Sequence, residues 1–144
     1  MRLTQHIAVS SIVSLGLYAW TQSFPIAISS FLAGFLLDLD HLIDYWREHP
    51  IKFDLIHFFK TCEEFRLVKV YLFLHSIELL LPLGFLAYYS RSPWVLGFLI
   101  GFSQHMLFDH LLNPVFPYTY SFFYRWNKGF ANEKVFDIKK QSNG

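Results

Sequence analysis

Four apolar stretches alternate with short polar breaks along this chain. The third and fourth reach the roughly 20 residues that a helix needs to cross the hydrocarbon core of a bilayer, and the first two are about 18 residues long. Apolar runs of this length predict four transmembrane helices, at about residues 3–20, 24–42, 70–89 and 94–112. The breaks "TQSFP" and "SRSP" contain turn-forming residues and predict that the helices are joined as two tight hairpins.

The loop between the second and third stretches, residues 43–69, contains a shorter amphipathic pattern. Apolar side chains in "FDLIHFFKTCEEF" recur at helical spacing, and most of the charged side chains fall elsewhere on the helical wheel. This pattern is typical of a helix that lies in the membrane surface. The apolar positions are Leu55, Phe58, Phe59, Cys62 and Phe65.

The segment after the fourth stretch differs from the apolar runs. We expect Pro114 and Pro117 to end the fourth helix, and "YTYSFFYRWNKGF" then supplies Tyr and Trp side chains that suit the membrane interface. We expect Arg125 and Lys128 either to anchor this segment at the interface or to hold an anionic head group. The end of the chain looks like a loose polar tail. We therefore expect an all-α protein, with a transmembrane bundle over residues 1–115 and an interfacial segment plus cytoplasmic tail over residues 116–144.

Composition agrees with a membrane protein. Hydrophobic residues make up 53% of the 144 residues, and charged residues only 16%. The net charge of +1 gives no electrostatic case for nucleic-acid binding. The single cysteine, Cys62, excludes an internal disulfide and a cysteine-based zinc site. These features indicate a small integral membrane protein whose partner is the lipid bilayer.

Basic residues are distributed unevenly between the two sides that four spans define. Eleven of the twelve Lys and Arg residues fall at the N-terminus, in the central loop or after the fourth stretch, and Arg91 alone falls on the other side. Cytoplasmic segments of membrane proteins carry such an excess of Lys and Arg. The sequence therefore predicts a multi-pass protein with both termini in the cytoplasm.

Histidines and acids gather at one end of all four predicted helices. His6 lies at the start of the first helix, "DLDHLID" (residues 38–44) ends the second, and His75 lies just inside the third. His105 and Asp109 lie one to two turns before the end of the fourth helix. They share a face with Gly97 and Gly101, which come eight and four residues before His105. Because the helices alternate in direction, we expect all these groups to reach the cytoplasmic leaflet and to face the interior of the bundle.

Imidazole plus carboxylate without thiolate is a ligand set for Zn²⁺, Mn²⁺ or Fe²⁺. A bound cation also explains how acids inside a bundle stay charged. We expect one or two divalent ions, with Zn²⁺ the first choice, and the expected ligands are His6, Asp38, Asp40, His41, His75, His105 and Asp109. Asp40 and Glu78 are the candidates for catalytic acid–base work, and Glu78 is equally suited to orienting a ligand. His110 lies about 100° around the helix from Asp109, so we do not expect it to bind the metal.

These motifs resemble those of a known family. His6, "LDLDHLID" at 37–44, "LHS" at 74–76 and "HMLFDH" at 105–110 are similar to motifs of the bacterial inner-membrane metal-dependent hydrolases, which are also labelled LexA-binding. That family is regarded as distantly related to zinc-dependent phospholipase C and P1 nuclease. The resemblance covers about residues 1–115 and implies phosphoester hydrolysis by metal-activated water at the inner membrane. Many members carry His-Arg-x-x-Thr-His-Ser, and "VYLFLHS" lacks the first three of these side chains, so the resemblance implies one or two metal ions rather than three.

Three classes of function are open at this point. The first is a membrane-embedded metal-dependent hydrolase that acts on a lipid or another phosphoester from the cytoplasmic leaflet. The second is a transporter for a metal ion or for protons, because intramembrane histidines and acids also line ion paths. The third is a metal-stapled membrane scaffold that binds a protein partner.

Overall fold

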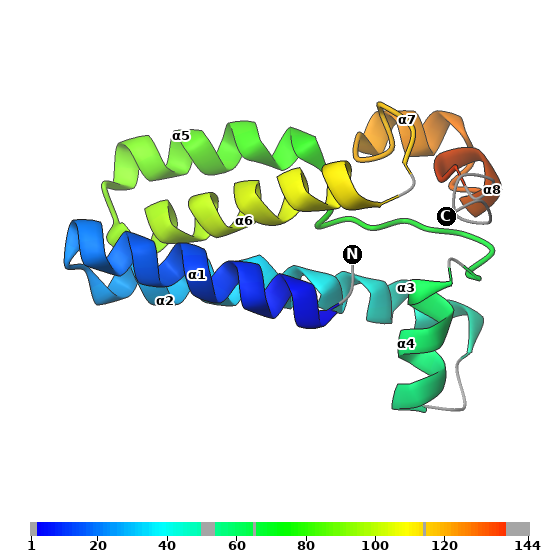
Figure 1. Cartoon of the computed structure of the whole chain (residues 1–144). Coiled ribbons are helices and arrows are strands. Elements are labelled where there is room, and N and C mark those ends of the chain that lie inside the picture. The colour runs from blue at the N-terminus through cyan, green and yellow to red at the C-terminus, as the bar shows by residue number, and fades with distance from the viewer. Residues whose placement is uncertain (1–2, 50–53, 65, 114, 138–144) are drawn as a thin grey trace.

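The computed structural model of this chain is built from helices, as the sequence predicts (Figure 1). The structure describes residues 3–49, 54–64, 66–113 and 115–137. Within those ranges the chain forms no β-sheet, and its only strand-like contacts are two isolated bridges. The predicted all-α class is therefore confirmed for the described part of the chain.

The four longest apolar segments form two antiparallel hairpins. The first hairpin joins α1 (Leu3–Thr21) to α2 (Phe24–Leu36), and the second joins α5 (Leu80–Ser90) to α6 (Pro93–Leu112). Both turns lie where the sequence predicts them. Each contains one residue in the left-handed backbone region, with φ of 53° at Gln22 and 49° at Arg91. The two hairpins lie side by side, with their turns at the same end of the molecule (Figure 1).

Helices α2 and α6 form the centre of the bundle, with α1 packed against α2 and α5 against α6. Their backbones approach so closely that a Cβ atom at Gly101 would overlap the backbone of Ser30, and one at Gly97 would overlap the backbone of Ile26. Small residues allow such an approach, and this is how helices pack in membranes. The glycine-bearing face of α6 is thus the packing face, as predicted.

Within the described residues, two helices are long and apolar enough to cross a membrane, by length and composition. One is α6, and the other is the continuous rod Phe24–Glu48, in which α2 continues through η1 (Leu37–Leu39) into α3 (Asp40–Glu48). The prediction of a helix over residues 70–89 is wrong in its first part, because helix begins only at η2 (Ile77–Leu79) and continues into α5. A membrane bundle of four spans stays a prediction.

The segment that precedes η2 is irregular for a physical reason. Several of its backbone N–H groups, among them those of Tyr71 and Leu74, donate to carboxylates on α3 rather than to carbonyl groups one turn earlier, so a continuous ladder of helical hydrogen bonds does not form. Leu72 also takes a left-handed conformation, with φ of 47°. We call residues 67–76 the strap, and it runs along α3 before the chain enters η2.

The predicted short helix in the central loop is present as α4 (Leu55–Glu63). Asp54 caps its first turn by accepting hydrogen bonds from the backbone N–H groups of Ile56 and His57. Figure 1 shows α4 projecting across the direction of the bundle, which is the orientation that a helix in the membrane surface needs. Its position in that surface stays a prediction, and Phe65 lies outside the described residues.

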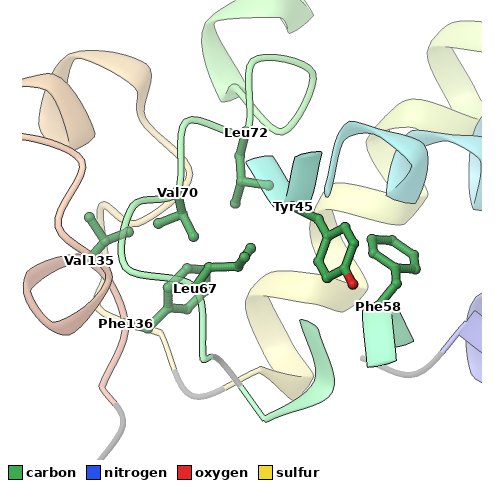
Figure 2. Packing of buried hydrophobic residues seen from close by; sticks show 7 residues of the cluster. All are labelled: Tyr45, Phe58, Leu67, Val70, Leu72, Val135 and Phe136. Atoms are coloured by element: carbon green, nitrogen blue, oxygen red, sulfur yellow. The ribbon is translucent and has the colours of Figure 1, made fainter. Parts of the chain in front are cut away.

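An apolar core lies beyond the end of the bundle. It joins α3, α4, the strap and α8 (Asn132–Val135), with Val135 and Phe136 buried, so the last described residues do not form the predicted loose tail. The core residues are shown in Figure 2, and they are Tyr45, Phe58, Leu67, Val70, Leu72, Val135 and Phe136. Residues 138–144 of the predicted tail lie outside the described ranges, as do the basic residues Arg2, Lys52, Lys139 and Lys140.

Candidate metal centre

Histidine and carboxylate side chains from separate elements meet at the end of the bundle opposite the hairpin turns. Candidate ligand atoms of His6, Asp38, His105 and Asp109 all lie within 4.8 Å of one another. A second group, formed by Asp38, His41 and His75, meets the same criterion and shares Asp38 with the first. The predicted convergence of these side chains is confirmed, and six of the seven predicted ligands belong to one or both groups.

The centre is closed except near Asp38 and His41, which are each only partly buried. The side chains of His6, His75, His105 and Asp109 are almost completely buried, whereas the side chain of Asp38 is 21% exposed. Asp38 is also the residue that the two groups share. Access from outside to the centre is therefore on the side of Asp38 and His41.

Two imidazole nitrogens face each other across the centre. The Nε2 atoms of His75 and His105 are 3.0 Å apart. The Asp109 Oδ2 atom lies 3.4 Å from the Nε2 atom of His105 and 3.7 Å from that of His75. The Asp38 Oδ1 atom lies 3.7 Å and 3.8 Å from the same two nitrogens. Two imidazole nitrogens and two carboxylate oxygens thus surround one point.

The hydrogen-bond partner of the Nδ1 atom in each ring indicates which of the two nitrogens carries the proton. The Nδ1 atom of His105 is 2.9 Å from the carbonyl oxygen of Gly34, which only accepts hydrogen bonds, so Nδ1 must be the donor. The Nδ1 atom of His75 faces the Asp40 carboxylate at 3.4 Å. In the neutral rings both Nε2 atoms then carry lone pairs that point at each other. Lone pairs at this separation repel unless a cation or a proton lies between them.

Asp40 lies behind His75 rather than in either ligand group. Its Oδ2 atom accepts a hydrogen bond from the backbone N–H of Leu74 at 2.6 Å and faces the His75 ring. Asp40 is buried, with 1% of the residue exposed. A carboxylate that binds the outer nitrogen of a metal-binding histidine orients the ring and raises its basicity. The contacts of Asp40 therefore fit an orienting role, and its predicted roles as a metal ligand and in catalysis stay predictions.

Asp40 is the first of three acids that hold the strap. Asp44 and Glu48 follow on the same face of α3 at steps of four residues. The Asp44 carboxylate accepts from the backbone N–H groups of Tyr71 and Leu72, and Glu48 accepts from those of Val68 and Lys69. This row of carboxylates places the strap, and with it His75, against the rod.

His6 and His41 complete the two groups. The Nε2 atom of His6 lies 3.0 Å from the Asp109 Oδ1 atom, and its ring stacks on that of His105 with a centroid distance of 4.1 Å. The His41 ring lies 5.1 Å from that of His75 and is only partly buried. His110 is exposed, in agreement with the prediction that it points away from the centre.

Glu78 has contacts elsewhere. Its carboxylate accepts hydrogen bonds from the Ser121 hydroxyl at 2.6 Å and from the Phe122 backbone N–H at 3.0 Å, at the start of α7 (Phe122–Asn127). It belongs to neither ligand group among the described residues. Its hydrogen bonds tie α7 to η2, and its predicted role in acid–base catalysis stays a prediction without a supporting contact.

Sequence reasoning missed Tyr120 as a neighbour of the centre. Asn113 donates one amide hydrogen to the Tyr120 hydroxyl at 2.9 Å and another to Asp109 Oδ1 at 3.0 Å, so the tyrosine and the acid are linked through one side chain. Burial, together with the nearby Asp109 carboxylate, raises the pKa of Tyr120 well above its usual value. Nothing in the aromatic segment distinguishes Tyr120 from its exposed neighbour Tyr118, so no sequence signal identified it.

Searches of protein-family models, of curated proteins and of solved structures found no match to this chain.

Proposed function

We propose that this chain is a membrane-embedded hydrolase that uses one or two divalent metal ions, Zn²⁺ first among them, to cleave a phosphoester at the cytoplasmic leaflet. The observation that carries the proposal is the pair of Nε2 atoms of His75 and His105, 3.0 Å apart with outer nitrogens that face acceptors. Two nitrogen ligands of one tetrahedral Zn²⁺ ion are about 3.3 Å apart, given bonds of about 2.05 Å. The spacing of the two nitrogens is thus close to what a shared metal ion requires.

The donor set supports a metal that activates water. Imidazole and carboxylate ligands without thiolate suit Zn²⁺, Mn²⁺ and Fe²⁺, and such an ion, when bound, lowers the pKa of its water and polarises a phosphoryl oxygen. Asp38 lies at the open edge of the centre, where a substrate has access. Because Asp38 belongs to both groups, the same residues suit either one ion or two that share this carboxylate.

The surface of the bundle supports a membrane location. Large apolar side chains on its outer faces are exposed, among them Leu15, Leu32, Leu81 and Phe85. Aromatic side chains are exposed at both ends of the bundle, as in the aromatic belts of membrane proteins. Trp20, Tyr88 and Trp94 lie at the hairpin turns, and Trp46 and Trp126 lie toward the end that carries the centre. An uncharged lipid-facing surface with the centre near one interface suits a lipid phosphoester as substrate.

The resemblance to the inner-membrane metal-dependent hydrolases supports the same proposal, since its motif residues His6, His75, His105 and Asp109 belong to the ligand groups. Within the bacterial inner membrane the centre would face the cytoplasm, as the distribution of Lys and Arg predicts.

One observation favours an ion transporter instead. Polar side chains continue from the centre into the bundle, where Gln104 donates to the Ser10 hydroxyl at 3.1 Å and both side chains are buried. Against a continuous path, the backbones of α2 and α6 are in contact at Gly97 and Gly101, farther from the centre. The hydrolase proposal therefore accounts for the centre better than an ion path does.

The test is hydrolysis by purified protein in detergent and in liposomes. We expect the protein to cleave a generic phosphodiester, to lose this activity with a chelator and to regain it when Zn²⁺ or Mn²⁺ is added. Metal or proton flux into protein-containing liposomes, without any hydrolysis of phosphodiester or of lipid, would contradict the proposal and favour a transporter.

A further inference from the structure

Arg125 is buried, although the sequence suggested an interfacial anchor or a head-group ligand. It lies on α7 with 0% of its surface exposed, so it is not available to a head group. The guanidinium has five N–H donors, and the structure gives five hydrogen bonds from it, at 2.7–3.1 Å. A fully buried and fully bonded arginine has a defined task within the fold.

Four of the five bonds go to the strap. The guanidinium donates to the carbonyl oxygens of Tyr71, Leu72 and His75 and to the Ser76 hydroxyl. The fifth goes to the carbonyl oxygen of Thr119. Arg125 thus binds the carbonyl groups of the strap, while the acids on α3 bind its N–H groups.

The charge of Arg125 is retained in this site. Burial lowers the pKa of the guanidinium to about 10, against the opposing effect of the carboxylates of Glu78, Asp40 and Asp44. The side chain is therefore protonated at neutral pH, and its hydrogen bonds are charge-assisted. Its planar fork holds several carbonyl groups in fixed relative positions, which the single ammonium group of a lysine does not do.

The strap needs such support because its own residues do not form a helix. His75 is the one member of the candidate ligand groups that does not lie on a helical segment. The direction of its ring depends on the conformation of residues 71–76, which includes the left-handed Leu72. One of the five bonds of Arg125 is to the carbonyl group of His75 itself, at 3.0 Å.

We propose that Arg125 is a positioning residue of the metal centre, which fixes the strap so that the His75 Nε2 atom points at His105 and Asp38. This inference rests on the proposed function, because it assumes that the centre holds a metal ion. It also gives α7 a task in metal binding, although α7 supplies no ligand.

The test compares Arg125→Lys, which keeps the charge and loses the fork, with Lys128→Met as the matched control. Lys128 is exposed and lies one turn farther along, at the end of α7. Zn²⁺ affinity is measured by competition with a chelator in detergent, and folding is followed by thermal melting. We expect Arg125→Lys to bind Zn²⁺ about 10–100-fold more weakly, as is typical when a residue that supports a ligand is lost, and Lys128→Met to stay near the wild-type affinity.

The same change in a His75→Ala background separates positioning from general stability. If Arg125 acts through His75, Arg125→Lys causes no further loss of Zn²⁺ affinity once His75 is gone. An equal loss in both backgrounds would overturn the inference. If Arg125→Lys does not fold, the test uses Ser76→Ala instead, which removes one of the five acceptors of Arg125. Ser76→Ala is expected to weaken Zn²⁺ binding several-fold when His75 is present and to have no effect on it in the His75→Ala background.

The failures of the two proposals are distinguishable. A wild-type protein that binds no divalent metal ion would overturn the proposed function and this inference together. A wild-type protein that binds Zn²⁺, with Arg125→Lys equally tight, would overturn only the role of Arg125.

Discussion

The replacement of His105 by alanine, compared with the same change at His110, tests which face of α6 carries the chemistry. The two residues are five positions apart on one helix, but His105 is 0% exposed and lies between Asp38 and Asp109, whereas His110 is exposed. His105→Ala removes a nitrogen ligand and the hydrogen bond to the Gly34 carbonyl group. His110→Ala removes an exposed side chain that belongs to neither ligand group and whose ring lies 6.3 Å from that of Tyr120.

The expected size of the effect follows from linkage. Loss of a residue that supports a ligand typically weakens metal binding 10–100-fold, so loss of the ligand itself is expected to cost at least as much, or about 1.4–2.7 kcal/mol. With free metal at about 100 times the wild-type Kd, metal binding stabilises the wild-type protein by about 2.7 kcal/mol. At the same metal concentration, a variant that binds 100-fold more weakly gains only about 0.4 kcal/mol.

The assay is thermal melting of detergent-purified protein with and without added Zn²⁺. We expect His105→Ala to lose most of the metal-dependent rise in melting temperature, and His110→Ala to keep it. Equal losses in the two variants, or a larger loss in His110→Ala, would mean that the proposed face of α6 and the proposed centre are both wrong.

Two further predictions concern packing and orientation. Gly101→Ala places a methyl group against the backbone of Ser30 and is expected to destabilise the bundle by about 1–3 kcal/mol in thermal melts. The control Gly84→Ala, whose methyl group meets open space, is expected to be neutral or slightly stabilising. Equal stability of the two variants would refute the close approach of α2 and α6. In a cysteine-free background, a membrane-impermeant thiol reagent added outside intact cells should label a cysteine at Ser92 and not one at Lys128. Strong outside labelling at Lys128 would reverse the predicted orientation.

The helical hairpins were predictable because their signals are local. The length of the apolar runs, the turn residues and the glycine spacing on α6 each depend on residues that are close in sequence. The convergence of His6, Asp38, His105 and Asp109 followed from one further step, because alternating helices bring the ends that carry these residues together.

The strap was not predictable from its own residues. "VYLFLHS" has the composition of a buried helix, and its irregular conformation depends on carboxylates that come from α3, about thirty residues earlier. The acids Asp40, Asp44 and Glu48 were visible at steps of four, but nothing local shows which segment they bind. The burial of Arg125 likewise results from distant carbonyl groups that only the folded chain brings together.

The most direct test of the account is the metal content of the protein as it is purified. Elemental analysis of the detergent-purified wild type is expected to give at least one tightly bound divalent ion per chain, and the double variant His75→Ala/His105→Ala, which removes both facing nitrogens, is expected to give none. The double variant His110→Ala/Lys128→Met, with two exposed residues changed, is the control and should keep the metal. A wild-type protein without metal, or stoichiometric metal that survives the loss of both His75 and His105, would contradict the central claim.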